Sequence, residues 1–480
     1  MEKQEKKDGE KLKEVVKTGE NIVIGAGKIP IEAVKTTVEV EKESIKLIEH
    51  AAEKIADEPP LKQVKNFWHG LGPGLTTGSA DDDPSGIVTY SQTGAKYGFQ
   101  LLWLAWFTFP LMAIVQEMCA RIGLQTGRGL AYNIRQHFPR WVLYLTTFLL
   151  LSANSFNIGA DLGALAKATQ LFWPSASFVL LIIFFTLFSL FLQIFISYEK
   201  YARYLKYLAL LLGVYIITAF VIKDFPWESV IRHGLIPSLS INKEQIILIS
   251  AIFGTTISPY LFFWQTSQEV EEQKSNGRNQ AELSSGASTK DLKKMRLDVW
   301  VGMFFSNLAM FFIIAVAGAV LLPAGITNIN SAADAASALR PLAGNYAYLL
   351  FALGIFGVGL LGIPVLAGSA SYAVSESFGW REGLDKKFTQ AKAFYGVIIF
   401  SMIIGLIINF LGFDPVRTLI WAAVLNGLVA PVILVLIVLL SSNKNVMAAR
   451  TNSFTIKFFG WLATIVMIIV GLATIASFFI

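Results

Sequence analysis

Long apolar stretches recur along most of this chain, and short polar segments separate them. About 20 consecutive apolar residues cross a bilayer as a helix, and the pattern predicts eleven such spans. They lie near residues 68–97 (interrupted), 99–122, 139–169, 175–197, 203–222, 244–270 (interrupted), 296–322, 345–373, 391–411, 417–441 and 455–479. The chain is therefore predicted to be an all-α, multi-pass membrane protein.

The first part of the chain has a different character. Residues 1–66 are rich in Lys and Glu, and Pro59 and Pro60 mark the end of this segment. We interpret 1–66 as a charged cytoplasmic tail and 67–480 as the transmembrane domain.

Basic residues alternate between the loops in the way that the positive-inside rule requires. Loops on the side of the tail carry many Lys and Arg, which fall within 121–140, 200–206, 274–296, 381–392 and 444–457. Loops on the other side carry few, namely Lys96, Lys223, Arg232, Lys243, Arg340 and Arg417. The pattern places the N-terminus in the cytoplasm and the C-terminus outside, in what we expect to be the cell membrane.

The amino-acid composition also indicates that most of the chain lies in a lipid bilayer. The 480 residues are 54% hydrophobic and 15% charged, whereas soluble proteins average about 25% charged residues. The net charge of +6 reflects cytoplasmic loops, so no nucleic-acid partner is expected. Cys119 is the single cysteine and cannot form an internal disulfide. The oligomeric state is left open, and a monomer is compatible with the sequence.

The first span is interrupted by residues 78–86, GSADDDPSG. Each charge at membrane depth costs about 2.5–3.5 kcal/mol even on lenient scales, and proline removes a backbone donor from a helix. Such a segment persists in a bilayer only where it lines a cavity or is buried in protein. We therefore predict a broken helix with a functional site at the break.

The sixth span repeats this arrangement at residues 254–260, GTTISPY. The two breaks open the first and sixth spans, so each heads a set of five helices. Paired interruptions in corresponding positions indicate an inverted-repeat transporter with its site at the midplane. Repeat one is expected at about 67–222 and repeat two at about 244–441, with an extra helix at about 455–479.

The chemistry of the breaks favours a cation. An unwound segment exposes backbone carbonyls, and the acids add negative charge. Carboxylate, carbonyl, hydroxyl and water oxygens are the ligands of hard cations, and clustered acids favour a divalent one.

These residues and their surroundings resemble the Nramp family of proton-coupled divalent-metal transporters. The resemblance covers nearly the whole chain after the tail, and it implies a LeuT-type fold. It rests also on Gly72-Pro73-Gly74, Ala120-Arg121-Ile122-Gly123, Thr126-Gly127-Arg128, Ala160-Asp161-Leu162 and Gly460-Trp461-Leu462.

The resemblance implies roles for particular residues. The first-span motif of the family is Asp-Pro-Gly-Asn, and its sixth-span motif is Ala-x-x-Met-Pro-His. Asp83 takes the place of the metal-binding aspartate, whereas Ala80 and Thr255 match residues that offer backbone carbonyls. Asp82 is a further candidate, although only some of three consecutive side chains can point into one cavity.

The chain also departs from the family pattern. In the family motifs, the position of Gly86 is an asparagine that binds the metal, that of Ser258 a methionine and that of Tyr260 a histidine. In the third span, Ala164 takes the position of a glutamate. This pattern resembles a divergent branch, some of whose members are associated with Mg²⁺. Loss of the soft thioether removes a bias toward softer transition metals, and small residues are expected to leave a roomier cavity for a hydrated ion. Mn²⁺ also accepts oxygen ligands, and Fe²⁺ stays a candidate substrate.

Two further polar residues interrupt apolar spans. Asp161 in the third span and Asn426 in the tenth are candidates for the ion path, because ionisable or polar groups inside a membrane are costly. A helix–helix hydrogen bond is the plainer interpretation of Asn426.

We expect neither an enzyme nor a bound cofactor. The sequence contains no phosphate-binding loop motif and no His-Glu-x-x-His helix. The alternative function is that of a cation-coupled organic-solute symporter with the same fold, although three adjacent acids disfavour a carboxylated substrate.

Overall fold

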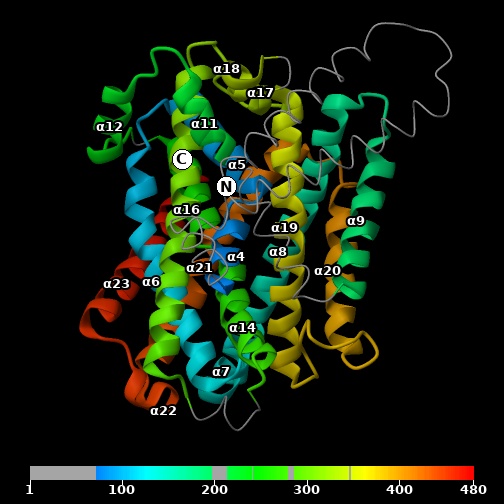
Figure 1. Ribbon diagram of the computed structural model, residues 1–480, viewed down its shortest axis with the longest axis vertical. Coiled ribbons are helices and arrows are strands. Elements are labelled where there is room, and N and C mark those ends of the chain that lie inside the picture. The colour runs from blue at the N-terminus through cyan, green and yellow to red at the C-terminus, as the bar shows by residue number, and fades with distance from the viewer. Residues whose placement is uncertain (1–71, 197–212, 241, 279–285, 345–346, 480) are drawn as a thin grey trace, which may run out of the picture. The chain divides into compact units, whose positions relative to one another are not determined.

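The computed structural model describes residues 72–479 except 197–212, 241, 279–285 and 345–346. The predicted tail and the first part of the predicted fifth span lie outside these residues. Within the described part the protein consists of helices joined by loops, without strands (Figure 1).

The helices, labelled as in Figure 1, have the following bounds. They are α4 (Pro73–Asp81), α5 (Pro84–Tyr97), α6 (Trp103–Thr126), α7 (Leu130–His137), α8 (Arg140–Phe172), α9 (Phe178–Phe195), α11 (Gly213–Val221), α12 (Trp227–Leu235), α13 (Lys243–Thr256), α14 (Pro259–Ser275), α16 (Thr289–Val320), α17 (Ala332–Ala336), α18 (Arg340–Ala343), α19 (Ala347–Phe378), α20 (Lys392–Ile408), α21 (Pro415–Ser442), α22 (Lys444–Met447) and α23 (Phe454–Ser477).

Eight stretches of the described chain are long and apolar enough to cross a membrane, with α13 and α14 counted as one. The other three predicted spans correspond to the pair α4–α5, to α11, which is described from Gly213, and to the shorter apolar helix α20. Both predicted interruptions are present as breaks between consecutive helices. The short helices α7, α12, α17, α18 and α22 were not predicted.

Some predicted boundaries were wrong by up to two turns. The seventh span begins at Thr289 instead of 296, because Ser288 and Asp291 form a capping box that starts α16 earlier. The eighth span continues to Phe378 instead of 373. Arg121, interpreted as a loop residue, lies buried within α6.

Each broken helix packs on the second span of the other repeat: α4 packs on α16, and α14 packs on α6. A Cβ on Gly74 of α4 would lie 2.6 Å from the backbone nitrogen of Val299 in α16. On the other side of the fold, a Cβ on Gly123 of α6 would overlap the carbonyl oxygen of Thr266 in α14. Glycine permits this close approach of two backbones inside a membrane. The reciprocity is what a 5+5 inverted repeat requires.

Two helices lie at the periphery of the bundle. Figure 1 shows α9 and α23 at opposite sides of it. Leu187 and Phe195 of α9 are 62% and 72% exposed, and Leu472 of α23 is 62% exposed. An apolar surface of this kind is stable where it faces lipid chains, whereas the breaks lie within the protein.

Candidate functional site at the two helix breaks

The first break is formed by Asp82 and Asp83. Asp82 leaves helical geometry at the C-cap of α4, with φ −87° and ψ 51°. Asp83 is the N-cap of α5 and accepts a hydrogen bond from the backbone N–H of Gly86. Pro84 occupies the first position of α5, where its missing N–H costs nothing. Proline and a capping aspartate together therefore restart the helix.

The second break also lies between two helices and is followed by a proline, but the residue before that proline is Ser258, which contributes a hydroxyl in place of a carboxylate. α13 ends at Thr256, Ile257 departs from helical geometry, and Pro259 begins α14. The Ser258 hydroxyl lies 2.7 Å from the carbonyl oxygens of both Gly254 and Thr255. Ser258 thus satisfies carbonyls that the end of α13 would otherwise leave unpaired.

The structure brings the two breaks into direct contact. The Tyr260 hydroxyl donates to the Ala80 carbonyl oxygen at 2.9 Å, and Thr255 Oγ1 lies 3.4 Å from the Asp81 carbonyl oxygen. A Cβ on Gly86 would lie 3.0 Å from Thr255 Oγ1. The room expected at Gly86 is therefore partly taken by the Thr255 hydroxyl.

The three acids are all buried, at 0–1% exposure, and Asp81 and Asp83 contact different helices. Asp81 Oδ2 accepts a 2.8 Å hydrogen bond from Ser306 of α16. Asp83 Oδ2 accepts one of 2.9 Å from Asn157 of α8. Neither oxygen of Asp82, nor Oδ1 of Asp81, has a partner among the described residues. The break therefore presents unsatisfied carboxylate oxygens inside the protein.

Asp161 and Asp83 both lie against α19 at Gly362. A Cβ on Gly362 of α19 would lie 3.1 Å from Asp83 Cβ and 3.7 Å from Asp161 Oδ2. Both oxygens of Asp161 are buried without a partner in the described chain. Asn426 of α21 is likewise buried and unpartnered, but no hydrogen bond joins it to either break.

Sequence reasoning missed Ser85, Asn157 and Ser306, which bond directly to the acids. Asn157 could have been found, because it precedes Asp161 by four residues and so shares its helix face. Ser85 lies within the predicted interruption at 78–86 but was given no role. Ser306 carries no such signal, since serine is common within membrane spans.

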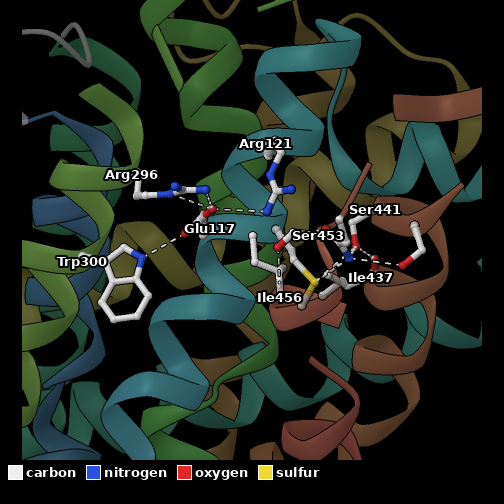
Figure 2. A network of polar contacts seen from close by, with 11 residues as sticks. Glu117, Arg121, Arg296, Trp300, Ile437, Ser441, Ser453 and Ile456 are labelled. Carbon is white, nitrogen blue, oxygen red and sulfur yellow. Dashed lines mark hydrogen bonds and ion pairs between the residues drawn. The ribbon is translucent and has the colours of Figure 1, made fainter. Parts of the chain in front are cut away.

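Polar contacts centred on the buried Glu117 side chain join α6 to α16 away from the breaks. Figure 2 shows Arg296, Arg121 and Trp300 converging on Glu117. Arg296 Nη2 lies 2.7 Å from Glu117 Oε1, and Trp300 Nε1 donates to Oε2 at 2.9 Å. Glu117 is 2% exposed. The Arg296 side chain is 58% exposed, whereas that of Arg121 is 7% exposed and pairs with Glu117 within α6. The contacts of Arg296 and Trp300 with Glu117 therefore link the second spans of the two repeats.

Asp298 of α16 caps the start of α4 from another helix. Its carboxylate accepts hydrogen bonds from the backbone N–H groups of Gly72, Gly74 and Leu75 at 2.8, 2.6 and 3.2 Å. Gly72, the N-cap residue of α4, supplies no side-chain cap. A cavity of about 300 Å³ lies beside this contact, and Asp298, Glu269, Glu272, Gln273 and Lys294 are among the residues that line it.

We expect Asp298→Ala to loosen the start of α4. The change leaves three N–H groups without their charged acceptor, and hydrogen bonds to charged groups contribute about 1.5–3 kcal/mol each. Amide hydrogen exchange across 72–77 should therefore accelerate by at least about tenfold. Asp291→Ala is the matched control, since Asp291 caps α16 but does not contact α4. Unchanged exchange in the Asp298 variant would show that glycine packing alone holds α4.

Comparison with known proteins places this geometry in a family. Residues 74–477 match the family described as natural resistance-associated macrophage protein-like (Nramp). A divalent metal cation transporter MntH of Klebsiella pneumoniae is 25% identical over 416 residues, which are 84% of this chain and 92% of the relative. The MntH of Caldanaerobacter subterraneus is 27% identical over 428 residues, with 85% and 93% coverage.

Solved structures show the same fold. The manganese transporter of Eremococcus coleocola superimposes with a TM-score of 0.66 at 18% identity, covering 86% of this chain and 87% of that one. Mhp1, a nucleobase-cation-symport-1 family transporter, superimposes with a TM-score of 0.54 at 13% identity, covering 85% and 91%. With a family match over nearly all of the described residues and two broken helices at its centre, the chain belongs to the Nramp family and has the LeuT-type fold.

Proposed function

We propose that this protein transports divalent metal cations across a membrane by alternating access, with Mg²⁺ and Mn²⁺ as its first substrates and Fe²⁺ as a weaker one. The curated relatives named above as divalent metal cation transporters support the class of substrate. The observation that carries the proposal is the set of buried carboxylate oxygens without partners at the first break and on Asp161. A buried carboxylate stays ionised only when it is paired with a cation or coordinates a metal ion.

The donor set favours hard ions. The groups that meet at the breaks are carboxylates, hydroxyls and backbone carbonyls, and the Ser258 position offers no sulfur. Oxygen ligands suit Mg²⁺ and Mn²⁺, whereas a thioether would favour softer metals. Mg²⁺ usually keeps several waters and is held through one or two carboxylates. A site centred on Asp83 and Asp82, with the carbonyls of Ala80 and Thr255 beside them, offers the one or two carboxylates that Mg²⁺ binding requires.

Uptake into the cytoplasm across the cell membrane is the direction we propose. The distribution of Lys and Arg between the loops favours a cytoplasmic N-terminus, which gives the orientation of the chain in that membrane. The rival function, cation-coupled transport of an organic solute, is disfavoured by the buried acids, which would repel a carboxylated substrate.

The test is uptake by the purified full chain in proteoliposomes, with Mg²⁺, Mn²⁺, Fe²⁺ and Ca²⁺ measured in parallel. Saturable uptake of Mg²⁺ and Mn²⁺ is expected, with Ca²⁺ the poorest substrate. Tight Mn²⁺ binding together with no detectable Mg²⁺ transport would contradict the magnesium assignment. Absence of transport for all four ions would contradict the function as a whole.

Proton coupling is expected to be weak. Tyr260 and Ala164 stand where the family resemblance implies titratable groups, and the Tyr260 hydroxyl is engaged with the Ala80 carbonyl. A pH-sensitive dye inside the liposomes should therefore report little acidification during Mg²⁺ influx. Acidification that rises in proportion to metal uptake would refute this expectation, and Asp161→Asn would then test whether Asp161 carries the proton.

A further inference from the structure

Gln92 of α5 is a buried amide, and both of its polar ends bond to the backbone of a distant loop. Its Nε2 donates to the Thr327 carbonyl oxygen at 3.1 Å, and its Oε1 accepts from the Ile329 N–H at 2.7 Å. Gln92 itself is 6% exposed. A carboxamide can pair in this way because it carries a donor and an acceptor, as a peptide group does. An apolar side chain at this position would leave both backbone groups without this partner.

The loop belongs to residues 327–336, which we call the outer segment and which includes α17. Within the described chain, the other hydrogen bonds of its side chains join residues no more than four positions apart. One side of the segment is exposed, at Thr327, Asn328 and Asn330, and the other is buried, at Ile329, Ala335 and Ala336. Apart from apolar packing, Gln92 is therefore what attaches the outer segment to the described helices.

The outer segment lies across the helices that surround Asp83. α17 packs against α5, α8 and α19. Asp83 caps α5, Asp161 lies on α8, and Gly362 of α19 lies against both acids. Gln92 is about 13 Å from Asp83 along the axis of α5, at about 1.5 Å per residue. Figure 1 shows α17 at the end of the bundle opposite to α7 and α22, and the loop charges assign that end to the outside.

We propose that Gln92 is the latch of an outer lid: the outer segment covers the path from outside to Asp83, and its two hydrogen bonds to Gln92 break each time that path opens. Both bonds are present in this structure, so the lid is closed. Gly325, just before the segment, has a φ of 77° and no atom within 4 Å of the position of a Cβ, which leaves room for a hinge. Two neutral hydrogen bonds stabilise a closed state modestly, so they can break in every cycle. The inference rests on the proposed function, because alternating access requires an outer path that opens and closes.

The rate at which a cysteine below the lid is labelled tests the proposal. Gln92→Met keeps the approximate length of the side chain and removes both polar ends. Ala164→Cys is the reporter, in a Cys119→Ala chain that has no other cysteine. Ala164 is 8% exposed and follows Asp161 by three residues, so it shares its helix face. With purified full chain and no metal ion, a charged maleimide should label Ala164→Cys at least about fivefold faster in the Gln92→Met variant, because loss of two hydrogen bonds raises the open fraction.

A second reporter and a matched control separate the latch from general loosening. Ser267→Cys lies on α14, towards the cytoplasmic side, and Ser267 is 3% exposed. It should label no faster when Gln92 is replaced, since the latch acts on the outer path alone. Gln170 of α8 donates from Nε2 to the Ala176 carbonyl oxygen at 2.9 Å and has no hydrogen bond to the outer segment in the described chain. Gln170→Met should therefore leave the labelling of Ala164→Cys unchanged.

The possible outcomes are distinguishable. An unchanged labelling rate at Ala164→Cys in folded Gln92→Met, or an equal rise at both reporters, would overturn the inference. Labelling needs no transported ion, so neither result bears on the proposed function, which the uptake experiment decides. Thermal unfolding shows whether each variant is folded. Should Gln92→Met fail to fold, Gln92→Asn carries the test: its amide is one methylene shorter and cannot keep both bonds, so faster labelling at Ala164→Cys alone is again expected.

Discussion

Replacing Asp83 with alanine is expected to reduce divalent-cation uptake by more than about 100-fold, since even residues that only support a metal ligand cost 10–100-fold when mutated. Asp83 combines a buried charge with a free lone-pair position at the junction of the two broken helices. The protein should stay folded, because losing the helix cap costs only about 1 kcal/mol. Uptake and metal binding are measured beside thermal unfolding.

The chain offers a matched control for this change. Asp414 precedes Pro415 and caps α21 through the Arg417 N–H at 2.9 Å, in the way that Asp83 caps α5, but it is exposed. Asp414→Ala should lose a similar amount of stability and keep transport. Asp83→Asn separates the charge from the cap, and it should fail to transport while retaining the stability of the unmodified protein. Normal uptake by folded Asp83→Ala would exclude Asp83 from the site.

Ser258→Met is expected to raise the affinity for Cd²⁺ by about tenfold, which corresponds to about 1.4 kcal/mol. A thioether supplies a soft ligand that the oxygen-only site lacks. The same change should impair Mg²⁺ transport, because Ser258 is fully buried and its hydroxyl bonds the Gly254 and Thr255 carbonyls. Calorimetry with Cd²⁺ and Mg²⁺, and competitive uptake, measure both effects.

Ser258→Leu controls for size without sulfur. It should reduce Mg²⁺ transport as Ser258→Met does, but it should gain no affinity for Cd²⁺. An equal gain of Cd²⁺ affinity in both variants would show that bulk or the loss of the hydroxyl, and not the thioether, is responsible. No gain in either variant would place Ser258 away from the ion.

Hydrophobic patterning alone predicted the membrane spans and both interruptions, because each is a local property. A run of apolar residues is a helix in a bilayer wherever it packs, and the Pro84 and Pro259 breaks follow from a missing donor. The corresponding positions of the two breaks, in the first and sixth spans, could also be read from the sequence, and they indicated the correct inverted-repeat fold. Helix ends were less predictable, as at Thr289, since a capping box lies outside the apolar run.

The directions of the three acids were decided by tertiary structure. Asp81 and Asp83 are two positions apart, yet one bonds Ser306 and the other Asn157, on different helices. The torsion angles of an unwound segment determine where each side chain points, and no repeating period describes them. Asp298 likewise caps α4, although it is 224 residues away from Gly74 in the sequence. Chemical type and depth in the membrane can be read from the chain itself, whereas hydrogen-bond partners exist only once distant helices have packed together.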